Sequence, residues 1–545
     1  MRQTPPDDND DNQPPEFAPR DLWSDDSALR EAVAREGGGA YRQRLADYGA
    51  VAGDELLALS FDAHRDRPRL RSHDRFGARI DRVEFHPNYH AVMRTAIEHG
   101  VTGLSWTDPR PGAHVARAAL SYLHYQVEPG SSCPLTMTHA AVPVLRREPS
   151  LAEWADKAAA PVYDPREVPI GEKAGVTVGM GMTERQGGSD VRANTTAAVP
   201  MSAQGEYALT GHKWFFSAPM SDGFLVLAQA PAGLSCFLMP RRLPDGRRNG
   251  FALLRLKDKL GDWSNASSEV QFDAAWARRI GEEGRGVATI LEMVMLTRLD
   301  CMLGSAALMR IALAHAVHHC RHRRAFGRLL VEQPLMRNVL ADLAVEAEAA
   351  LALSMRVARA VDAAADDPQE AAFARVATAI GKYWVCKRAP AFVNEAQECI
   401  GGNGYVEESM LARLYRQAPL NSIWEGSGNI QCLDVLRALA REPGTATALW
   451  AELQVAGQGH ADLDAAAAAL YAPLHDPKSV DEAGARQLVE RLALALQAAV
   501  LLRADSPAAG VFCRSRLGGA HGLTLGTLPS AMPFAELIDR ALPAR

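Results

Sequence analysis

The spacing of apolar residues changes twice along this 545-residue chain, and these changes limit the folds available to it. From about residue 26 to 170 apolar residues recur at the spacing of amphipathic helices. Short β-like runs separated by Gly, Pro and Asp follow between 171 and 280. Helical spacing returns over 287–440, with 291–320 as the longest predicted helix and an alanine-rich partner at 342–364. The pattern predicts a helical layer, a small β-barrel or sandwich, and a helical bundle.

Two further segments flank this pattern. The first 20 residues contain five acidic groups and five prolines, so we expect a disordered acidic tail there. Glu-Pro-Gly at 442–444 interrupts the helical region, and the chain beyond it is again rich in Ala and Leu at helical spacing. The predicted domains are the tail (1–25), an N-terminal helical domain (26–170), a β domain (171–280), a helical bundle domain (281–440) and a C-terminal helical domain (441–545).

Composition excludes several classes of protein. A formal net charge of -6 argues against a protein that coats nucleic acid through its bulk charge. The eight cysteines are scattered, with no Cys-x-x-Cys pair and no secretory leader, so we expect reduced thiols in a cytoplasmic protein. The most apolar run, 492–502, is interrupted by Gln497 and is much shorter than the ~20 residues that span a bilayer. We therefore predict no membrane span.

A glycine-rich turn lies between two β-like runs at 182–191, where the sequence is Met-Thr-Glu-Arg-Gln-Gly-Gly-Ser-Asp-Val. Its glycines allow close approach of the backbone to a ligand. Gly179 and Gly181 just before it suggest a nicotinamide-binding fingerprint as an alternative. That fingerprint needs a third glycine and a following helix, and the sequence predicts neither.

This turn resembles the Thr-Glu-x-x-x-Gly-Ser-Asp signature of the acyl-CoA dehydrogenase superfamily, whose backbone amides and hydroxyls hold the flavin pyrimidine. Gly-His-Lys-Trp-Phe-Phe-Ser at 211–217 resembles the superfamily strand whose aromatic ring packs on the isoalloxazine and whose hydroxyl faces flavin N5. Ile-Trp-Glu-Gly-Ser-Gly-Asn-Ile at 423–430 resembles the segment that carries the catalytic glutamate. An aromatic pair in a strand is usually a core pair, and a lone Trp-Glu-Gly-Ser is usually a loop. The order and spacing of all three favour a flavin site.

The resemblance implies an acyl-CoA dehydrogenase-like fold, non-covalent FAD and an acyl-CoA substrate. Glu425 would be the base that removes the α-proton, or a residue that only orders the flavin loop. His-Arg-Arg-Ala-Phe-Gly at 322–327 resembles the run whose arginine reaches the diphosphate of a flavin held mainly by a neighbouring subunit. Glu398 stands where the superfamily usually has Gln, and its charge would weaken binding unless it faces away. The implied cofactor residues are Met182, Thr183, Gly188, Ser189, Phe215, Phe216, Ser217, Arg323, Phe326, Gly401, Gly402, Trp424, Ser427 and Asn429.

The motifs at 179–191, 211–217, 256–261 and 421–430, together with the additional C-terminal segment, resemble the AidB family of bacterial adaptive-response proteins, which is linked to DNA alkylation damage. This resemblance implies a homotetramer that binds duplex DNA through its C-terminal helical segment. Residues 441–545 carry nine Lys and Arg against eleven Asp and Glu, whereas phosphate-binding domains are usually basic. Any DNA-binding face must therefore be local, and ordinary surface arginines are the alternative. The candidates are Arg441, Arg503, Arg514 and Arg516.

A histidine cluster at 315–322 invites a metal site, but it lacks a carboxylate or a second cysteine and lies among arginines. We predict a basic helix face and no metal. Neither a Ser-His-Asp set nor a Walker loop supports a hydrolase or an NTPase. Two classes of function remain. One is a flavoprotein of the DNA-damage response that binds duplex DNA without sequence preference and has weak dehydrogenase activity. The other is a metabolic acyl-CoA dehydrogenase whose C-terminal domain serves assembly.

Overall fold

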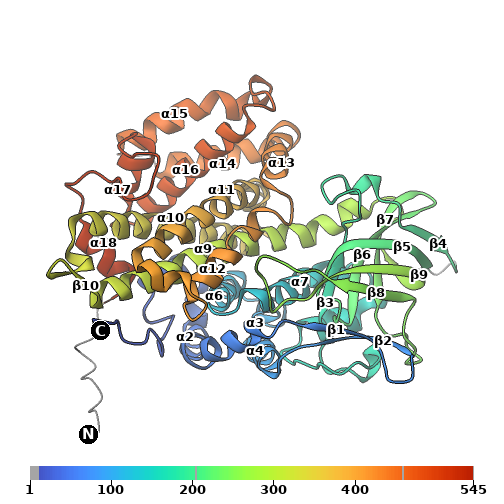
Figure 1. The fold of residues 1–545 in the computed structure, drawn as a ribbon. Helices are drawn as coiled ribbons and strands as arrows, with labels where there is room; N and C mark the ends of the chain where they lie inside the picture. Colours follow the sequence, from blue (N-terminus) through green and yellow to red (C-terminus); the bar gives the residue numbers. More distant parts are fainter. Residues whose placement is uncertain (1–11, 203–204, 457–459, 544–545) are drawn as a thin grey trace, which may run out of the picture. The chain divides into compact units, whose positions relative to one another are not determined.

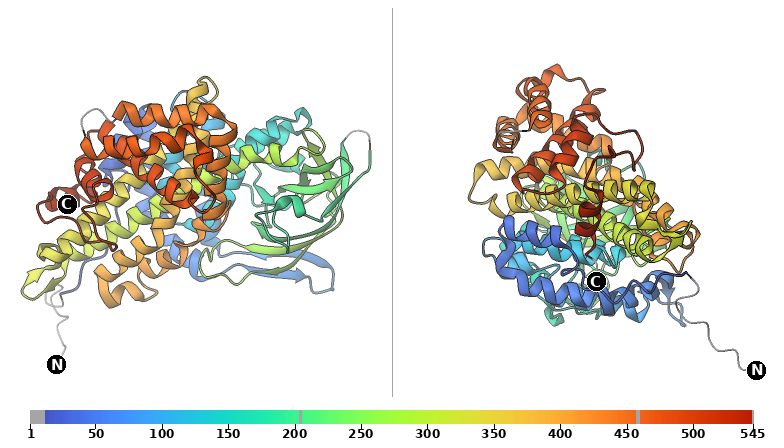
Figure 2. Two further views of the ribbon diagram at one scale, coloured as in Figure 1. Left: turned by 90° about the horizontal axis from the view of Figure 1, so that it is seen from above. Right: turned by 90° about the vertical axis from the view of Figure 1, so that its left-hand side faces the viewer.

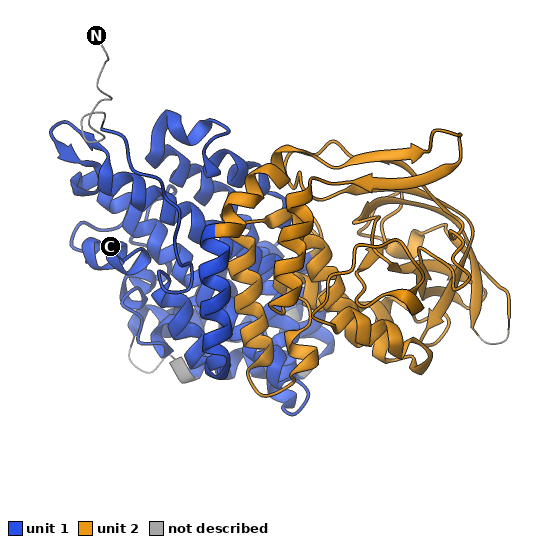
Figure 3. Ribbon diagram, turned by 90° about the horizontal axis from the view of Figure 1, so that it is seen from below, with its two compact units in different colours: residues 1–54, 301–423, 431–545 blue, residues 55–300, 424–430 orange. Residues whose placement is uncertain are grey.

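The computed structural model describes residues 12–543 except 203–204 and 457–459. The chain forms two compact units, which Figure 3 colours separately. The barrel unit contains residues 55–300 and 424–430, and the helical unit contains the chain up to residue 54, 301–423 and 431–545. The long helix α9 (Gly286–His322) contributes residues to both units, and it covers the predicted helix at 291–320.

Five of the described strands close into a ring in the barrel unit (Figure 1). The ring runs β6–β4–β5–β9–β7 and returns to β6, while β3 pairs with β6 and β8 pairs with β9. Closure leaves the ring no free edge, and phenylalanines such as Phe216, Phe224 and Phe272 fill its core. Of the two predicted alternatives, a small β-barrel or a sandwich, the structure shows the barrel. The strands are β3 (Val178–Gly181), β4 (Ala197–Pro200), β5 (Glu206–Ser217), β6 (Gly223–Ala230), β7 (Gly233–Pro240), β8 (Phe251–Leu256) and β9 (Ser267–Ile280).

Helices and one unexpected hairpin precede the barrel. The main helices begin with ordinary signals: α7 has Pro129 at its first position, and the Glu128 carboxylate accepts from Ser131 N at 2.6 Å. The hairpin of β1 (Arg69–His73) and β2 (Arg79–Glu84) lies where helix was predicted. The prediction missed it because these charged strands contain too few apolar residues to show the alternation of a strand. The helices are α3 (Leu57–Arg65), α4 (Pro87–Glu98), α5 (Leu104–Thr107), α6 (Ala113–Tyr125), α7 (Pro129–Arg146) and α8 (Ala152–Ala159).

Two long helices, α10 and α11, form the centre of the helical unit (Figure 1). Pro368 begins α11, the Asp367 side chain caps its first turn, and Gly401 ends it with a φ of 72°. Besides parts of α9 and α13 (Gly428–Arg441), the helices of this unit are α1 (Ser27–Arg35), α2 (Arg42–Val51), α10 (Pro334–Ala363), α11 (Pro368–Ile400), α12 (Met410–Gln417), α14 (Pro443–Ala456), α15 (Ala461–His475), α16 (Ala485–Arg503), α17 (Ala509–Phe512) and α18 (Phe534–Ala541).

The C-terminal segment is helical, as predicted, and packs on this centre. Figure 2 shows its helices, coloured orange to red, gathered beside α10 and α11. The apolar run 492–502 lies in α16, whose side chains are mostly buried against α10, α11, α14 and α15. Across the described part of the chain, no helix is long and apolar enough to cross a membrane.

The start of the chain departs from the predicted tail. Residues 1–11 lie outside the described residues, but Leu22 and Trp23 are buried in the helical unit. Arg310 Nη2 also donates to Asp25 O at 2.8 Å. The prediction of a disordered tail is therefore wrong for residues 12–25, because two apolar side chains and their neighbours find partners in the fold.

Candidate functional site

The glycine-rich turn follows β3 directly and has a fixed shape. A Cβ on Gly188 would lie 2.5 Å from Thr183 Oγ1, so this position has no room for a side chain. Asn194 Nδ2 donates to Met182 O at 2.9 Å and holds the start of the turn. Ser189 is exposed. The turn is thus a rigid backbone cradle with an accessible hydroxyl, as a flavin clamp requires.

A buried ion pair supports this turn. Lys213 Nζ lies 2.8 Å from Glu184 Oε1, both side chains are fully buried, and the ammonium also donates to Leu227 O. Burial opposes the Glu184 carboxylate, but Lys213 and the donors at Thr195 and Thr196 outweigh it and lower the pKa of Glu184 to about 2. Burial lowers the pKa of Lys213 to about 8, so both groups are charged at neutral pH. We did not predict this pair, although an acid and a lysine inside two β-region motifs were its signal.

A β-bulge in β5 decides which aromatic residue is accessible. The pairing of β5 with β9 shifts between Lys213 and Phe216, so Trp214 and Phe215 together face one residue of β9. Phe215 is therefore 54% exposed, whereas Phe216 is fully buried and its ring centroid lies 4.4 Å from that of Phe224. The prediction that Phe216 binds the cofactor is wrong, because its ring belongs to the barrel core. Phe215 remains a predicted flavin contact.

Ser217 and Glu425 lie near the same buried thiol. Cys133 is a residue of α7, and burial is the main cause that raises its pKa. The carboxylates of Asp262 and Glu425 raise this pKa further, whereas a hydrogen bond with Ser217 lowers it. Ser217 Oγ is also 3.4 Å from Ser267 Oγ. The hydroxyl predicted to face flavin N5 and the predicted base thus both affect the Cys133 thiol electrostatically, and both belong to the barrel unit.

The backbone and carboxylate of Glu425 are both held by α9. Glu425 has a φ of 57°, which non-glycine residues rarely adopt, and Gly426 follows with a φ of 92°. Thr297 Oγ1 lies 2.6 Å from Glu425 Oε2, closer than its other acceptor, Val294 O, at 3.0 Å. Arg298 Nε donates to Glu425 O at 3.1 Å. Sequence reasoning missed Thr297 and Arg298, because only the fold brings a residue from the middle of α9 to this turn.

The neighbours of Glu425 in the sequence remain predicted cofactor contacts. Trp424 and Ser427 are half-buried and Asn429 is exposed at the start of α13. Their side chains are accessible enough to contact a bound dinucleotide.

The remaining cofactor candidates belong to the helical unit. Phe326 is 98% exposed, and a Cβ on Gly401 or Gly402 would meet no atom within 4 Å. Glu398 is exposed, while its neighbour Gln397 is buried and donates to Gly404 O at 2.8 Å, which shapes the turn η7 (Gly401–Tyr405). These positions leave open backbone and an aromatic ring at the surface of the unit.

The histidine cluster at the end of α9 packs against the chain itself. His315 stacks on Phe17 with ring centroids 3.9 Å apart, and burial lowers the pKa of His315 to about 3. Among the residues that the structure describes, no three His, Cys, Asp or Glu side chains are arranged to hold a metal ion.

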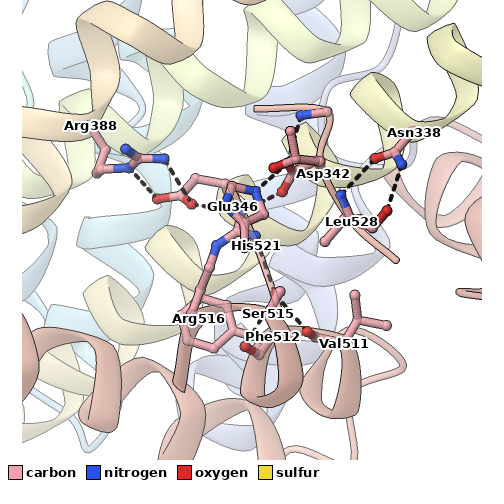
Figure 4. Close-up of polar contacts among 12 residues, drawn as sticks. Asn338, Asp342, Glu346, Arg388, Val511, Phe512, Ser515, Arg516, His521 and Leu528 are labelled. Carbon is pink, nitrogen blue, oxygen red and sulfur yellow. Dashed lines mark hydrogen bonds and ion pairs between the residues drawn. The ribbon is translucent and has the colours of Figure 1, made fainter. Parts of the chain in front are cut away.

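The four DNA candidates differ in accessibility. Arg441 and Arg514 are exposed, whereas Arg503 Nη2 forms an ion pair with Glu452. Arg516 is buried within a network of carboxylates, and Figure 4 shows it beside Asp342 and Glu346. It belongs to the π-helical turn η10 (Cys513–Leu517), which directs it inward. The prediction that Arg516 contacts DNA is wrong, because its guanidinium is already committed to buried partners.

Comparisons with known proteins agree with this architecture. The model of the adaptive response protein AidB N-terminal domain matches residues 12–165, the acyl-CoA dehydrogenase middle domain matches 179–275, and the acyl-CoA dehydrogenase C-terminal domain matches 284–440. The AidB protein of Escherichia coli (strain K12) is 46% identical over 519 residues, covering 94% of this chain and 95% of that protein. Acyl-CoA dehydrogenase family member 11 of Caenorhabditis elegans is 32% identical over 412 residues, covering 73% and 66%.

Solved structures support the same fold. The structure of Caenorhabditis elegans ACDH-11 in complex with C11-CoA has a TM-score of 0.82 and 26% identity, and it covers 98% of this chain and 92% of that one. An acyl-CoA dehydrogenase from Bacillus anthracis complexed with FAD has a TM-score of 0.65 at 18% identity, covering 79% and 81%. The second likeness concerns the fold alone.

Proposed function

Because the chain belongs to the AidB branch of the acyl-CoA dehydrogenase family, we propose that it is an FAD-binding protein of the DNA alkylation-damage response with weak acyl-CoA dehydrogenase activity. The observation that carries the enzymatic part is the position of Glu425. Its carboxylate accepts a hydrogen bond from Thr297 Oγ1 at 2.6 Å, and Ser217, the residue predicted to face flavin N5, belongs to the same unit.

The residues of the barrel unit fit a flavin. Gly188 lets the turn fold closely around the Thr183 side chain, Phe215 exposes an aromatic face, and Ser217 lies on the same strand. Thr183 and Ser189 would hold the pyrimidine side, as the family signature implies. When bound, FAD accepts the hydride that leaves the β-carbon of an acyl thioester.

The protein supplies the matching proton transfer. Glu425 takes the α-proton, and Thr297 and Arg298 hold its side chain and backbone for that transfer. A hydroxyl that donates to a carboxylate stabilises the charged form relative to the acid.

One experiment tests the enzymatic part. The purified protein should be yellow, and anaerobic titration with acyl-CoA thioesters of increasing chain length should bleach its flavin slowly. Rapid bleaching by one thioester would instead support the alternative, a metabolic acyl-CoA dehydrogenase whose C-terminal domain serves assembly. A colourless protein that takes up no added FAD would contradict both.

The hydrogen bond between Thr297 and Glu425 can be tested separately. Thr297→Val removes the hydroxyl but keeps the shape, so Glu425 loses a donor that favours its charged form. The pH at which flavin reduction reaches half its maximum should then rise. Stopped-flow reduction at a series of pH values measures this midpoint, and Thr297→Ser should retain the parental profile. An unchanged midpoint in Thr297→Val would show that this hydroxyl does not act on the base.

We propose that the holoprotein is a homotetramer, in which the diphosphate end of each flavin approaches the Arg323 region of a neighbouring subunit. The full exposure of Phe326 on the helical unit supports an intersubunit role for this region. Light scattering of the holoprotein measures the oligomeric state, and a monomer would contradict the proposal.

For DNA we propose a small face that includes Arg441 and Arg514, since Arg503 and Arg516 have carboxylate partners. Duplex binding should be modest and independent of sequence, because the segment 441–545 carries no excess of positive charge.

Changing Arg441 and Arg514 together to Ala should weaken binding to all duplexes equally. It should also flatten the plot of log affinity against log salt by about two units, because each phosphate contact contributes about -0.9 to that slope. Binding is measured by fluorescence anisotropy at two or more salt concentrations. Arg75→Ala with Arg82→Ala, two exposed arginines of the β1–β2 hairpin, removes the same charge elsewhere and should leave binding unchanged. Equal effects of the two double variants would move the DNA site away from Arg441 and Arg514.

A further inference from the structure

The N-terminal arm, defined here as residues 12–17, lies on the hairpin of β10 (Arg324–Ala325) and β11 (Arg328–Leu329). Arg323 Nη1 donates to Asn12 O at 2.7 Å. The Asn12 side chain accepts from Arg324 N at 2.8 Å and donates to Arg324 O at 2.9 Å, as a neighbouring strand would. Asn403 Nδ2 approaches Gln13 Oε1 at 3.4 Å. Two consecutive residues of the arm therefore engage both the hairpin and η7.

The other end of the arm is also anchored. His318 Nε2 lies 2.8 Å from Pro15 O, and Phe17 stacks on His315. The guanidinium of Arg20 lies 5.0 Å from the Phe17 ring centroid on the chain that continues into the fold. The arm is thus a strap fastened along its length to the end of α9.

The groups beneath the strap suit an anionic dinucleotide. Arg323 and Arg324 supply positive charge, Gly401 and Gly402 leave open backbone, and Phe326 presents an exposed ring. Asn12 O already occupies one donor of Arg323, and the residue behind it lies against η7. A diphosphate that approached Arg323 would meet this backbone.

We propose that the N-terminal arm is a displaceable strap, and that it competes with the FAD diphosphate for Arg323 and the groups around it. The inference rests on the FAD binding proposed above. It adds that residues 12–17 of the same chain regulate the affinity for FAD. The competing contacts are a few exposed hydrogen bonds and one aromatic stack, each of modest net effect. FAD would bind only to the molecules whose arm is displaced. The apparent affinity for FAD is therefore the intrinsic affinity multiplied by the fraction of such molecules. If this fraction is about one tenth, the arm weakens FAD binding about tenfold.

The test compares three forms of the apoprotein: the full chain, a form lacking residues 2–11 and a form lacking residues 2–17. Both truncations remove Asp7, Asp8, Asp10 and Asp11, so they differ only in the arm. FAD is titrated at about 0.15 M salt, where distant charges are screened, and bound FAD is followed by its absorbance and fluorescence. The form lacking 2–17 should bind FAD about tenfold more tightly than the other two. Thermal melting checks that all three forms are folded.

Phe17→Ala in the full chain provides a second route, because it loosens the strap without shortening it, and it should also tighten FAD binding. Equal affinity in all forms, or weaker binding without the arm, would overturn the strap while leaving FAD binding intact. If none of the folded forms binds FAD, the strap and the proposed cofactor are both wrong.

Discussion

Glu425→Gln should slow flavin reduction by acyl-CoA about 10²- to 10⁴-fold, which is the usual contribution of a general base. The amide keeps the shape of the side chain and can still accept from Thr297, but it cannot take the α-proton. FAD should remain bound, because the cradle at Gly188 and the exposed face of Phe215 are untouched. Anaerobic stopped-flow reduction with the best thioester measures the rate, and the visible spectrum measures bound FAD.

Glu408→Gln is the matched control, since it removes an exposed carboxylate elsewhere in the chain. It should reduce as fast as the parent. If Glu425→Gln also reduces at the parental rate, another residue is the base. If Glu425→Gln instead reduces slowly and also loses its FAD, Glu425 acts by ordering the flavin loop.

The fold was largely predictable because its signals are local. The change from helical to alternating apolar spacing near residue 171 and back near 287 locates the barrel, and α9 covers the helix predicted at 291–320. The hairpin β1–β2 was missed because its strands are charged and carry little alternation. The Arg20–Asp26 region was missed because a polar composition conceals the burial of Leu22 and Trp23.

The candidate site was less predictable because its details depend on three-dimensional contacts. The motif contained Phe215 and Phe216 side by side, and only the bulge in β5 separates the accessible ring from the core ring. Thr297 lies 128 positions before Glu425, so no local pattern connects them. The arm on Arg323 spans an even larger separation and begins in a segment that composition marks as a tail.

The network around Arg516 gives the second large prediction. Arg516 Nη2 pairs with Asp342 and Glu346, and His521 Nε2 lies 2.7 Å from the other oxygen of Asp342 (Figure 4). Burial opposes both carboxylates, yet their cationic partners, with Arg388 on Glu346, hold the pKa of each below its usual value. The network fastens the segment after α17 to α10.

Arg516→Ala should therefore lower the free energy of unfolding by up to about 3–5 kcal/mol at pH 7, the usual cost of removing one partner from a buried ion pair. Asp342 keeps His521 and Glu346 keeps Arg388, which limits the loss. Urea denaturation measures the loss. The native pKa values of Asp342 and Glu346 are lowered, so the parent loses this stabilisation as the pH falls through their ordinary range. The variant loses less, because its two carboxylates have each lost one cationic partner. The difference between the two proteins should therefore stay constant from pH 7 to about pH 5 and shrink below it.

Arg514→Ala is the natural control, because its side chain is exposed and its hydrogen bonds go to the neutral acceptors Gly510 O and the Met532 sulfur. It should change stability by less than about 0.5 kcal/mol. Still-folded Arg516→Ala should bind duplex DNA as the parent does, since its guanidinium faces carboxylates. A variant of parental stability that has lost DNA affinity would reverse this assignment and return Arg516 to the DNA-binding face.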